Sequence, residues 1–145
     1  MGICLTANNS KYSFNMSYGS FHNLRRNIAT AIDKEFGELY HKHIASIYMK
    51  DQLEAEQEIS KLLSDEERFP DTLQPIIYFL YESDCEGSVD YRTCKAIYDL
   101  IKDVDFEDKN FQYVSYRVGQ SISDYDKFKE FLRECYHYHR HMRWY

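Results

Sequence analysis

Residues near the start of the chain alternate between apolar and polar side chains, which is the pattern of a half-buried β-strand. Ile3 and Leu5 begin the alternation, and segment 12–18 continues it with a large apolar residue at every second position. The intervening Asn-Asn-Ser at 8–10 has the composition of a turn. The pattern therefore predicts a β-hairpin over residues 3–18, packed against helices.

From Ser20 onward the apolar residues recur every three or four positions, which is the spacing of one face of an α-helix. Ser20 and Ser123 have the side chains of helix N-caps. We expect helices over residues 20–47, 51–64, 72–81, 90–103 and 123–139, with 21–36 and 123–136 the most regular parts, and a short strand over 111–118. No internal repeat or linker interrupts the chain. The prediction is a mainly α fold: one compact helical domain over residues 1–145, with a small N-terminal β-hairpin as its minor β part.

Composition narrows the class of protein. A chain of 145 residues with 43% hydrophobic residues can bury one core without covalent cross-links. Its four cysteines are widely spaced and never form a CxxC pair, which favours reduced thiols in a cytoplasmic protein. No apolar run approaches the ~20 residues of a membrane span. The net charge of −6 argues against non-specific binding to nucleic acid, because that requires a broad basic surface.

The first six residues also fit the pattern of N-myristoylation, in which Gly2 is acylated after removal of Met1. Cys4 would then be available for palmitoylation. The same residues form the first predicted strand, so the sequence leaves lipidation of Gly2 open.

The loop between the third and fourth predicted helices resembles a calcium-binding EF-hand loop over residues 82–93. Oxygen-bearing side chains occupy positions 1, 3, 5 and 9 of this loop, and Gly87 occupies position 6. Thr93 replaces the bidentate glutamate of position 12, so we expect no calcium binding at micromolar concentrations. The alternative is a corner between helices, with Gly87 in a left-handed conformation and Ser88 or Asp90 capping the next helix.

Three histidines at positions 137, 139 and 141 lie close to Cys135. If the last helix continued, His137 and His141 would share one face and could form a zinc pair. Such a pair lacks a third and a fourth ligand unless distant histidines supply them. The alternative, half-buried aromatic residues at a helix end, predicts no metal and no cofactor.

The last eleven residues contain no acid, three histidines, two arginines and four large aromatic residues. So aromatic a segment is expected to be packed rather than disordered, and to bring Arg140 and Arg143 near the N-terminal aromatic strand. Aromatic rings with arginines nearby are typical of nucleotide binding. The candidate ligand-binding residues are Tyr12, Phe14, Tyr18, His22, Arg25, Arg26, Arg140, Arg143 and Trp144. Alternatively, Arg25 and Arg26 pair with acids and the aromatic residues belong to the core.

Segments 12–29, 79–87, 101–106 and 128–135, followed by Trp144, resemble a family of small uncharacterised proteins from Gram-positive bacteria and their phages and plasmids. The resemblance covers nearly the whole chain but brings no activity. It implies an accessory gene of mobile elements, whose small acidic products often inhibit or neutralise another protein.

Two functions are therefore expected. The first is a non-enzymatic inhibitor or immunity-type antagonist that binds a host or competitor protein and masks a basic site with an acidic face. The residues that could supply that face are Glu54, Glu56, Glu58, Asp65, Glu66, Glu67 and Asp71. The second is sequestration of a signalling nucleotide by the aromatic and arginine residues, although the chain has no glycine-rich phosphate loop. A degenerate calcium binder is a distant third, and no local signature of a catalytic nucleophile favours an enzyme.

Overall fold

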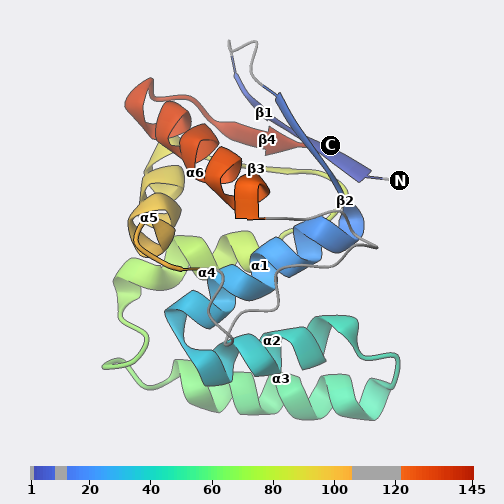
Figure 1. Cartoon of the computed structure of the whole chain (residues 1–145). Coiled ribbons are helices and arrows are strands. Elements are labelled where there is room, and N and C mark those ends of the chain that lie inside the picture. The colour runs from blue at the N-terminus through green and yellow to red at the C-terminus, as the bar shows by residue number, and fades with distance from the viewer. Residues whose placement is uncertain (1, 9–12, 106–121) are drawn as a thin grey trace.

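A computed structural model of the chain describes residues 2–8, 13–105 and 122–145 (Figure 1). The predicted strand over 111–118 and the candidate ligand-binding residue Tyr12 lie outside these residues. The elements are, in chain order, β1 (Gly2–Ala7), β2 (Ser13–Ser17), α1 (Tyr18–Ile32), α2 (Lys34–Ala45), α3 (Met49–Leu63), the 3₁₀ turn η1 (Asp71–Leu73), α4 (Gln74–Tyr81), β3 (Gly87–Val89), α5 (Tyr91–Ile101), α6 (Ile122–His137) and β4 (Met142–Trp144). The prediction of a mainly α fold with a minor β part is confirmed.

The β part is larger than the predicted hairpin. β1 and β2 pair as expected, but they belong to a four-stranded antiparallel sheet with the order β2-β1-β4-β3. β4 comes from the C-terminal tail, which we predicted to stay helical up to His139. This prediction was wrong because α6 ends at His137 and His139 takes a left-handed conformation with φ of 52°. That residue turns the chain back onto the sheet.

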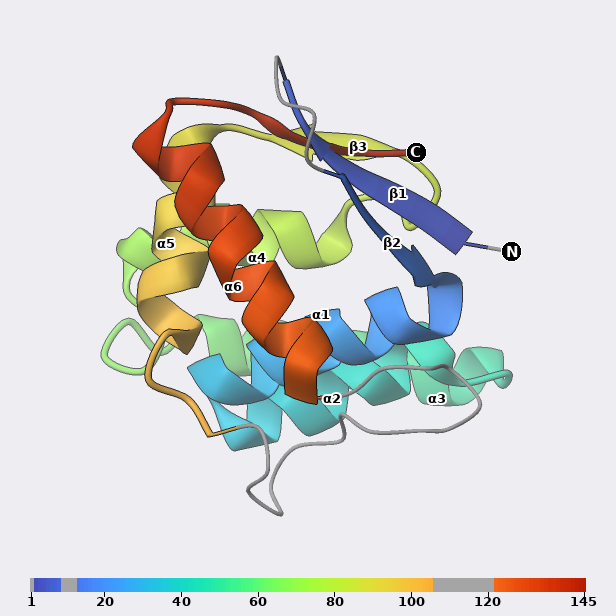
Figure 2. The ribbon, with the colours of Figure 1, turned by 45° about the horizontal axis from the view of Figure 1, so that its top comes forward.

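The inner face of the sheet is apolar along one row of paired residues. Leu5 of β1 lies opposite Phe14 of β2 and Trp144 of β4, and Trp144 lies opposite Gly87 of β3. Trp144 is 1% exposed, and its ring packs against Phe21 and Phe79. Figures 1 and 2 show the sheet at one end of the molecule and the α2–α3 pair at the other. The core between them is thus closed by the first and last segments of the chain.

The predicted helix over 20–47 is divided into α1 and α2. Asp33 adopts an extended conformation between them, and its carboxylate accepts a hydrogen bond of 3.0 Å from the backbone N–H of Phe36. α1 begins at Tyr18, with Ser17 as its cap, rather than after Ser20. The prediction missed this break because the apolar residues on both sides of Asp33 keep helical spacing, although the chain changes direction at this capping residue.

α1 and α2 pack so closely where Gly37 faces Thr30 that a Cβ at residue 37 would overlap the Thr30 side chain. α2 and α3 are antiparallel neighbours joined by a short turn (Figure 1). Among the described residues, no helix combines the length and the apolar character that crossing a membrane requires.

Candidate functional site

The residues predicted to bind a ligand are not gathered in one pocket. Phe14 is buried under the sheet, and Tyr18 begins α1 in a half-buried position. Among those that the structure describes, Arg25 packs against Trp144, with the guanidinium carbon 5.5 Å from the centre of the indole ring, and Arg25 and His22 line the same cavity.

Arg25 is only 4% exposed and is held by the protein itself. Its Nη1 donates to the Glu82 carbonyl over 2.7 Å and its Nη2 donates to the Ser83 carbonyl over 3.3 Å. The guanidinium lies 4.2 Å from the centre of the Phe21 ring, and Trp144 Nε1 donates to the same Ser83 carbonyl over 2.9 Å. Arg25 and Trp144 therefore fix the backbone of residues 82–83, where α4 ends.

The two arginines of the tail lie elsewhere, contrary to the expectation that they would approach the aromatic strand. Arg140 forms an ion pair of 3.0 Å with Glu134 and covers the Tyr138 ring. Arg143 is exposed opposite Thr6 of β1. Because β1 lies between β4 and β2, the tail pairs with the first strand and not with the aromatic one.

The EF-hand-like loop is a structural corner. Asp90 caps α5, since its carboxylate accepts a hydrogen bond of 2.9 Å from the Thr93 N–H, and this part of the alternative interpretation is confirmed. The expected left-handed conformation of Gly87 was wrong, because Gly87 lies in β3 without a positive φ. Glycine is required there for a different reason: an added Cβ would overlap the Trp144 ring.

The histidines of the tail are not placed as the zinc pair that a continued helix would allow. His137 ends α6, whereas His141 lies beyond the turn and directly before β4. His139 instead stacks on Tyr91, with ring centres 4.2 Å apart. In the part of the chain that the structure describes, no group of three or more histidine, cysteine, aspartate or glutamate side chains is placed to hold a metal ion.

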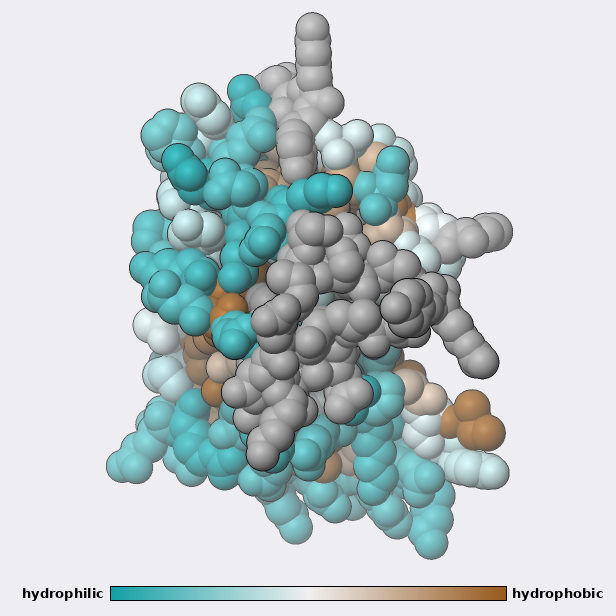
Figure 3. Space-filling model, viewed as in Figure 1, coloured by the Kyte–Doolittle hydropathy of each residue, from teal (hydrophilic) through white to brown (hydrophobic). Residues whose placement is uncertain are grey.

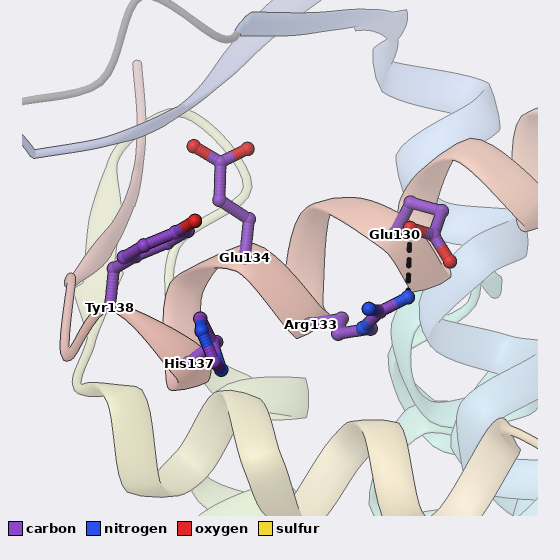
Figure 4. Close-up of a pocket in the computed structure, with 5 residues that line it drawn as sticks. All are labelled: Glu130, Arg133, Glu134, His137 and Tyr138. Atoms are coloured by element: carbon purple, nitrogen blue, oxygen red, sulfur yellow. Dashed lines mark ion pairs between the residues drawn. The ribbon is translucent and has the colours of Figure 1, made fainter.

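A hollow of about 320 Å³ runs along the exposed side of α6 (Figure 4). The residues that line it are Glu130, Arg133, Glu134, His137 and Tyr138. Arg133 pairs with Glu130 over 3.5 Å, and Glu134 pairs with Arg140. The charges in this hollow are thus already compensated within the helix and its C-terminal turn, which makes it a poor candidate for a binding site.

A more informative feature is a cluster of exposed apolar side chains. Nine large apolar residues are exposed in the described parts of the chain, and five of them fall between residues 44 and 53. These five, which we call the α2–α3 corner, are Ile44, Ile47, Tyr48, Met49 and Leu53. Figure 3 shows a hydrophobic group projecting from the α2–α3 turn, surrounded by more polar surface. Scattered exposed apolar residues are ordinary, but a contiguous group marks an interaction site.

Local hydrogen bonds hold the turn that presents this cluster. Ser46 ends α2 in an extended conformation, and its hydroxyl accepts a hydrogen bond of 3.2 Å from the Tyr48 N–H. Gln52, one turn into α3, donates its side-chain amide to the Ser46 carbonyl. The exposed rings and aliphatic chains are thus presented by a turn with its own hydrogen bonds. The sequence contained a signal for it, because Ile47, Tyr48 and Met49 form an apolar run between two amphipathic helices.

Beside the corner lies a cavity of about 220 Å³. Its walls include the buried side chains of Phe21, Tyr40 and Leu80, and the Tyr40 hydroxyl donates to the Leu80 carbonyl over 2.8 Å. Ile44 of the corner and Tyr81 also line it, and the Tyr81 ring packs edge-on against Tyr40 at 5.4 Å. The cavity therefore opens next to the exposed apolar cluster.

Burial keeps the His22 ring of the cavity neutral near neutral pH. Burial, with contributions from the neighbouring His41, Arg26 and Arg25, lowers the pKa of His22 to about 4, and His22 Nε2 lies 2.9 Å from His41 Nδ1. Burial also raises the pKa of Tyr40 to about 12. Near neutral pH the charged groups that line the cavity are therefore Arg25 and two acids, Glu82 and Asp84.

Comparisons of the chain with models of protein families, with curated proteins and with solved structures found no match. The proposals that follow therefore rest on the geometry and chemistry of this chain.

Proposed function

We propose that this protein is a non-enzymatic binding protein that attaches to another protein through the α2–α3 corner and blocks that partner. The observation that carries the proposal is the concentration of exposed apolar residues at one turn. Ile47 is 85% exposed and Tyr48 is 66% exposed, although both could contribute to a core. Apolar side chains grouped in this way gain free energy when a partner covers them.

The surroundings of the corner suggest the charge of the partner. All seven residues of the predicted acidic face are exposed, but only Glu54, Glu56 and Glu58 lie on α3, which begins at the corner; the other four follow the far end of this helix. Among the described residues, Glu54 of this set forms an ion pair with Lys42 over 3.9 Å. An exposed ion pair of this length contributes little to stability. An apolar centre beside these three exposed acids of α3 fits a partner surface with an apolar patch and a basic rim. Masking such a basic surface is the action of an antagonist, as expected for an accessory protein of a mobile element.

Sequestration of a nucleotide has less support. The arginines proposed for the phosphates are separated, and both Nη atoms of Arg25 already donate to backbone carbonyls. The cavity of about 220 Å³ is also smaller than the ~300–1,000 Å³ typical of small-molecule sites.

The test compares two tyrosines of similar exposure on different faces. Tyr48 of the corner is 66% exposed and Tyr138, after α6, is 60% exposed. We expect a protein captured from host lysate by the wild-type chain to be purified and to bind it in calorimetry. Tyr48→Ser should weaken this binding at least about tenfold, because aromatic residues at the centre of an interface commonly contribute more than ~1 kcal/mol.

Tyr138→Ser serves as the matched control and should bind like the wild type, while both variants should keep the wild-type melting temperature. Equal affinities of Tyr48→Ser and the wild type would exclude the corner as the binding surface. Binding that is weakened only by Tyr138→Ser would move the interface to α6.

A further inference from the structure

The cavity beside the α2–α3 corner has features that identify what it can receive. Its volume of about 220 Å³ lies between the ~150 Å³ cavity that holds a benzene ring and the lower end of small-molecule pockets. A space of this size accommodates one large side chain. Since Ile44 belongs to both the corner and the cavity, a partner seated on the corner would have the cavity within its footprint.

Two acids line the cavity. The carboxylate of Asp84 interacts with the cavity groups His22, Arg25 and Tyr40. For His22 and Arg25 it opposes burial, which lowers the pKa of both, and for Tyr40 it adds to burial, which raises the pKa. Within the described part of the chain, no recorded ion pair of 4.0 Å or less involves Asp84 or Glu82. Asp84 accepts a hydrogen bond from the neighbouring Cys85 thiol, and the cation of the cavity that interacts with its charge is Arg25.

Arg25 does not reverse this charge. Its single positive charge faces the two negative charges of Glu82 and Asp84, so the charged groups lining the cavity sum to −1 near neutral pH. Its Nη atoms are engaged by carbonyls, and its Nε is buried out of contact with solvent. An anion entering the cavity would meet a lining whose formal charges sum to −1, although the buried Nε of Arg25 has no hydrogen-bond partner of its own among the described residues.

The remaining lining is suited to the stem of a long basic side chain. Tyr81 is 38% exposed, and burial raises the pKa of its hydroxyl, so the ring stays neutral. A cation beside a tyrosine ring gains electrostatic attraction, and a methylene chain packs well against an aliphatic group such as Ile44. The lining thus offers an apolar wall for the stem and carboxylates for the head.

We propose that the cavity receives an arginine or lysine side chain of the protein partner, with its stem between Ile44 and Tyr81 and its cation facing Asp84 and Glu82. This rests on the proposed function, because it names the anchor of the same partner. In this proposal the acids of the cavity, and not those of α3, select a basic residue of the partner at the centre of the contact.

The first experiment needs no partner. Acetyl-arginine amide is titrated into the full ¹⁵N-labelled chain, and acetyl-citrulline amide, which has nearly the same shape but no charge, serves as the matched probe. With acetyl-arginine amide only, we expect the amide chemical shifts of Ile44, Tyr81 and residues 82–84 to change and to saturate at millimolar ligand concentrations. Asp84→Asn should weaken arginine binding about two- to fivefold, as for a partly exposed ion pair, whereas the exposed acid variant Asp103→Asn should not.

Shifts of equal size with citrulline, shifts unchanged in Asp84→Asn, or no shifts at the cavity would each overturn the inference. The outcome is separate from that of the proposed function, because Tyr48→Ser should leave the binding of acetyl-arginine amide unchanged. A partner that loses affinity in Tyr48→Ser but not in Asp84→Asn docks on the corner without a basic anchor. A partner that is insensitive to Tyr48→Ser removes the proposed function while the titration still reports on the cavity.

Discussion

At the scale of single residues, the sequence drew attention to side chains that are important, but the contacts of these side chains stabilise the fold. Arg25 and Trp144 were candidates for holding a ligand, and in the structure they hold the backbone of residues 82–83. Aromatic rings near an arginine look the same in sequence whether the cation serves a phosphate or a carbonyl. The two roles differ in the burial of the arginine, and Arg25 is almost completely buried.

Arg25 should therefore be important for stability and its neighbour Arg26 should not. Arg25→Lys replaces a planar fork that donates to two carbonyls by a single ammonium, which does not reproduce the geometry of both hydrogen bonds in this buried position. We expect the free energy of unfolding to fall by about 1–3 kcal/mol. Urea denaturation followed by the fluorescence of Trp144, which is the only tryptophan of the chain, measures this directly.

Arg26→Lys is the matched control, because Arg26 is half-exposed one position along the same helix. Its effect should stay within about 0.5 kcal/mol. Similar losses in both variants would show that the contacts of the buried guanidinium have no special value.

At the scale of elements, apolar spacing was sufficient to predict where the helices lie, but not where they end or which strands form the sheet. Residues 21–32 and 125–136 are helical as predicted, because one face of each helix repeats over several turns. The predicted helix over 21–36 is interrupted at Asp33, a capping residue that the spacing does not register. The strand β4 was missed because Met142 and Trp144 alternate over only three residues, and their partners lie far away in sequence in β1 and β3.

The contact between α1 and α2 should make stability dependent on pH. Burial, with smaller contributions from His41, Arg26 and Arg25, lowers the pKa of His22 from 6.5 to about 4, while Asp84 acts in the opposite direction. The unfolded chain therefore binds a proton below about pH 6.5, and the folded chain does not until about pH 4. Stability should fall as the pH falls through this window, by roughly 1–2 kcal/mol after allowing for the partial exposure of the ring.

Urea denaturation at a series of pH values tests this dependence. His22→Gln should remove part of the decline between pH 6.5 and 4, since the residue that takes up the proton in the unfolded state is gone. An identical decline in the variant would mean that other groups, such as His41, whose pKa burial also lowers, are responsible.

At the scale of the whole molecule, the two ends of the fold have different roles. The sheet end is closed by the C-terminal tail, whereas the α2–α3 end presents apolar residues to the surroundings (Figures 1 and 3). The sequence predicted that the tail is packed, because a segment rich in aromatic residues is costly to leave in water, but not that it forms a strand of the sheet. It did not predict the second, because Ile44 and Ile47 continue the helical spacing and looked like core residues.

The tail itself should be required for the fold. Deleting residues 142–145 removes the strand that joins β1 to β3, and uncovers Phe21 and Phe79 where the Trp144 ring now covers them. Burial of a ring of this size is worth roughly 2–3 kcal/mol, and each kcal/mol shifts the melting temperature of a domain this large by about 2–5 °C. We therefore expect the truncated chain to melt at least several degrees lower, as measured by circular dichroism.

Tyr145→Ser separates the loss of the strand from the loss of an aromatic end. Tyr145 is 65% exposed, although the aromatic tail was expected to be packed, and its backbone hydrogen bonds to Cys4 remain available to serine. The variant should melt within about a degree of the wild type, since exposed substitutions rarely change stability by more than about 0.5 kcal/mol. If the truncated chain melted like the full one, the pairing of β4 would be unimportant for the fold, and the aromatic tail would have to be reconsidered as a surface for a partner.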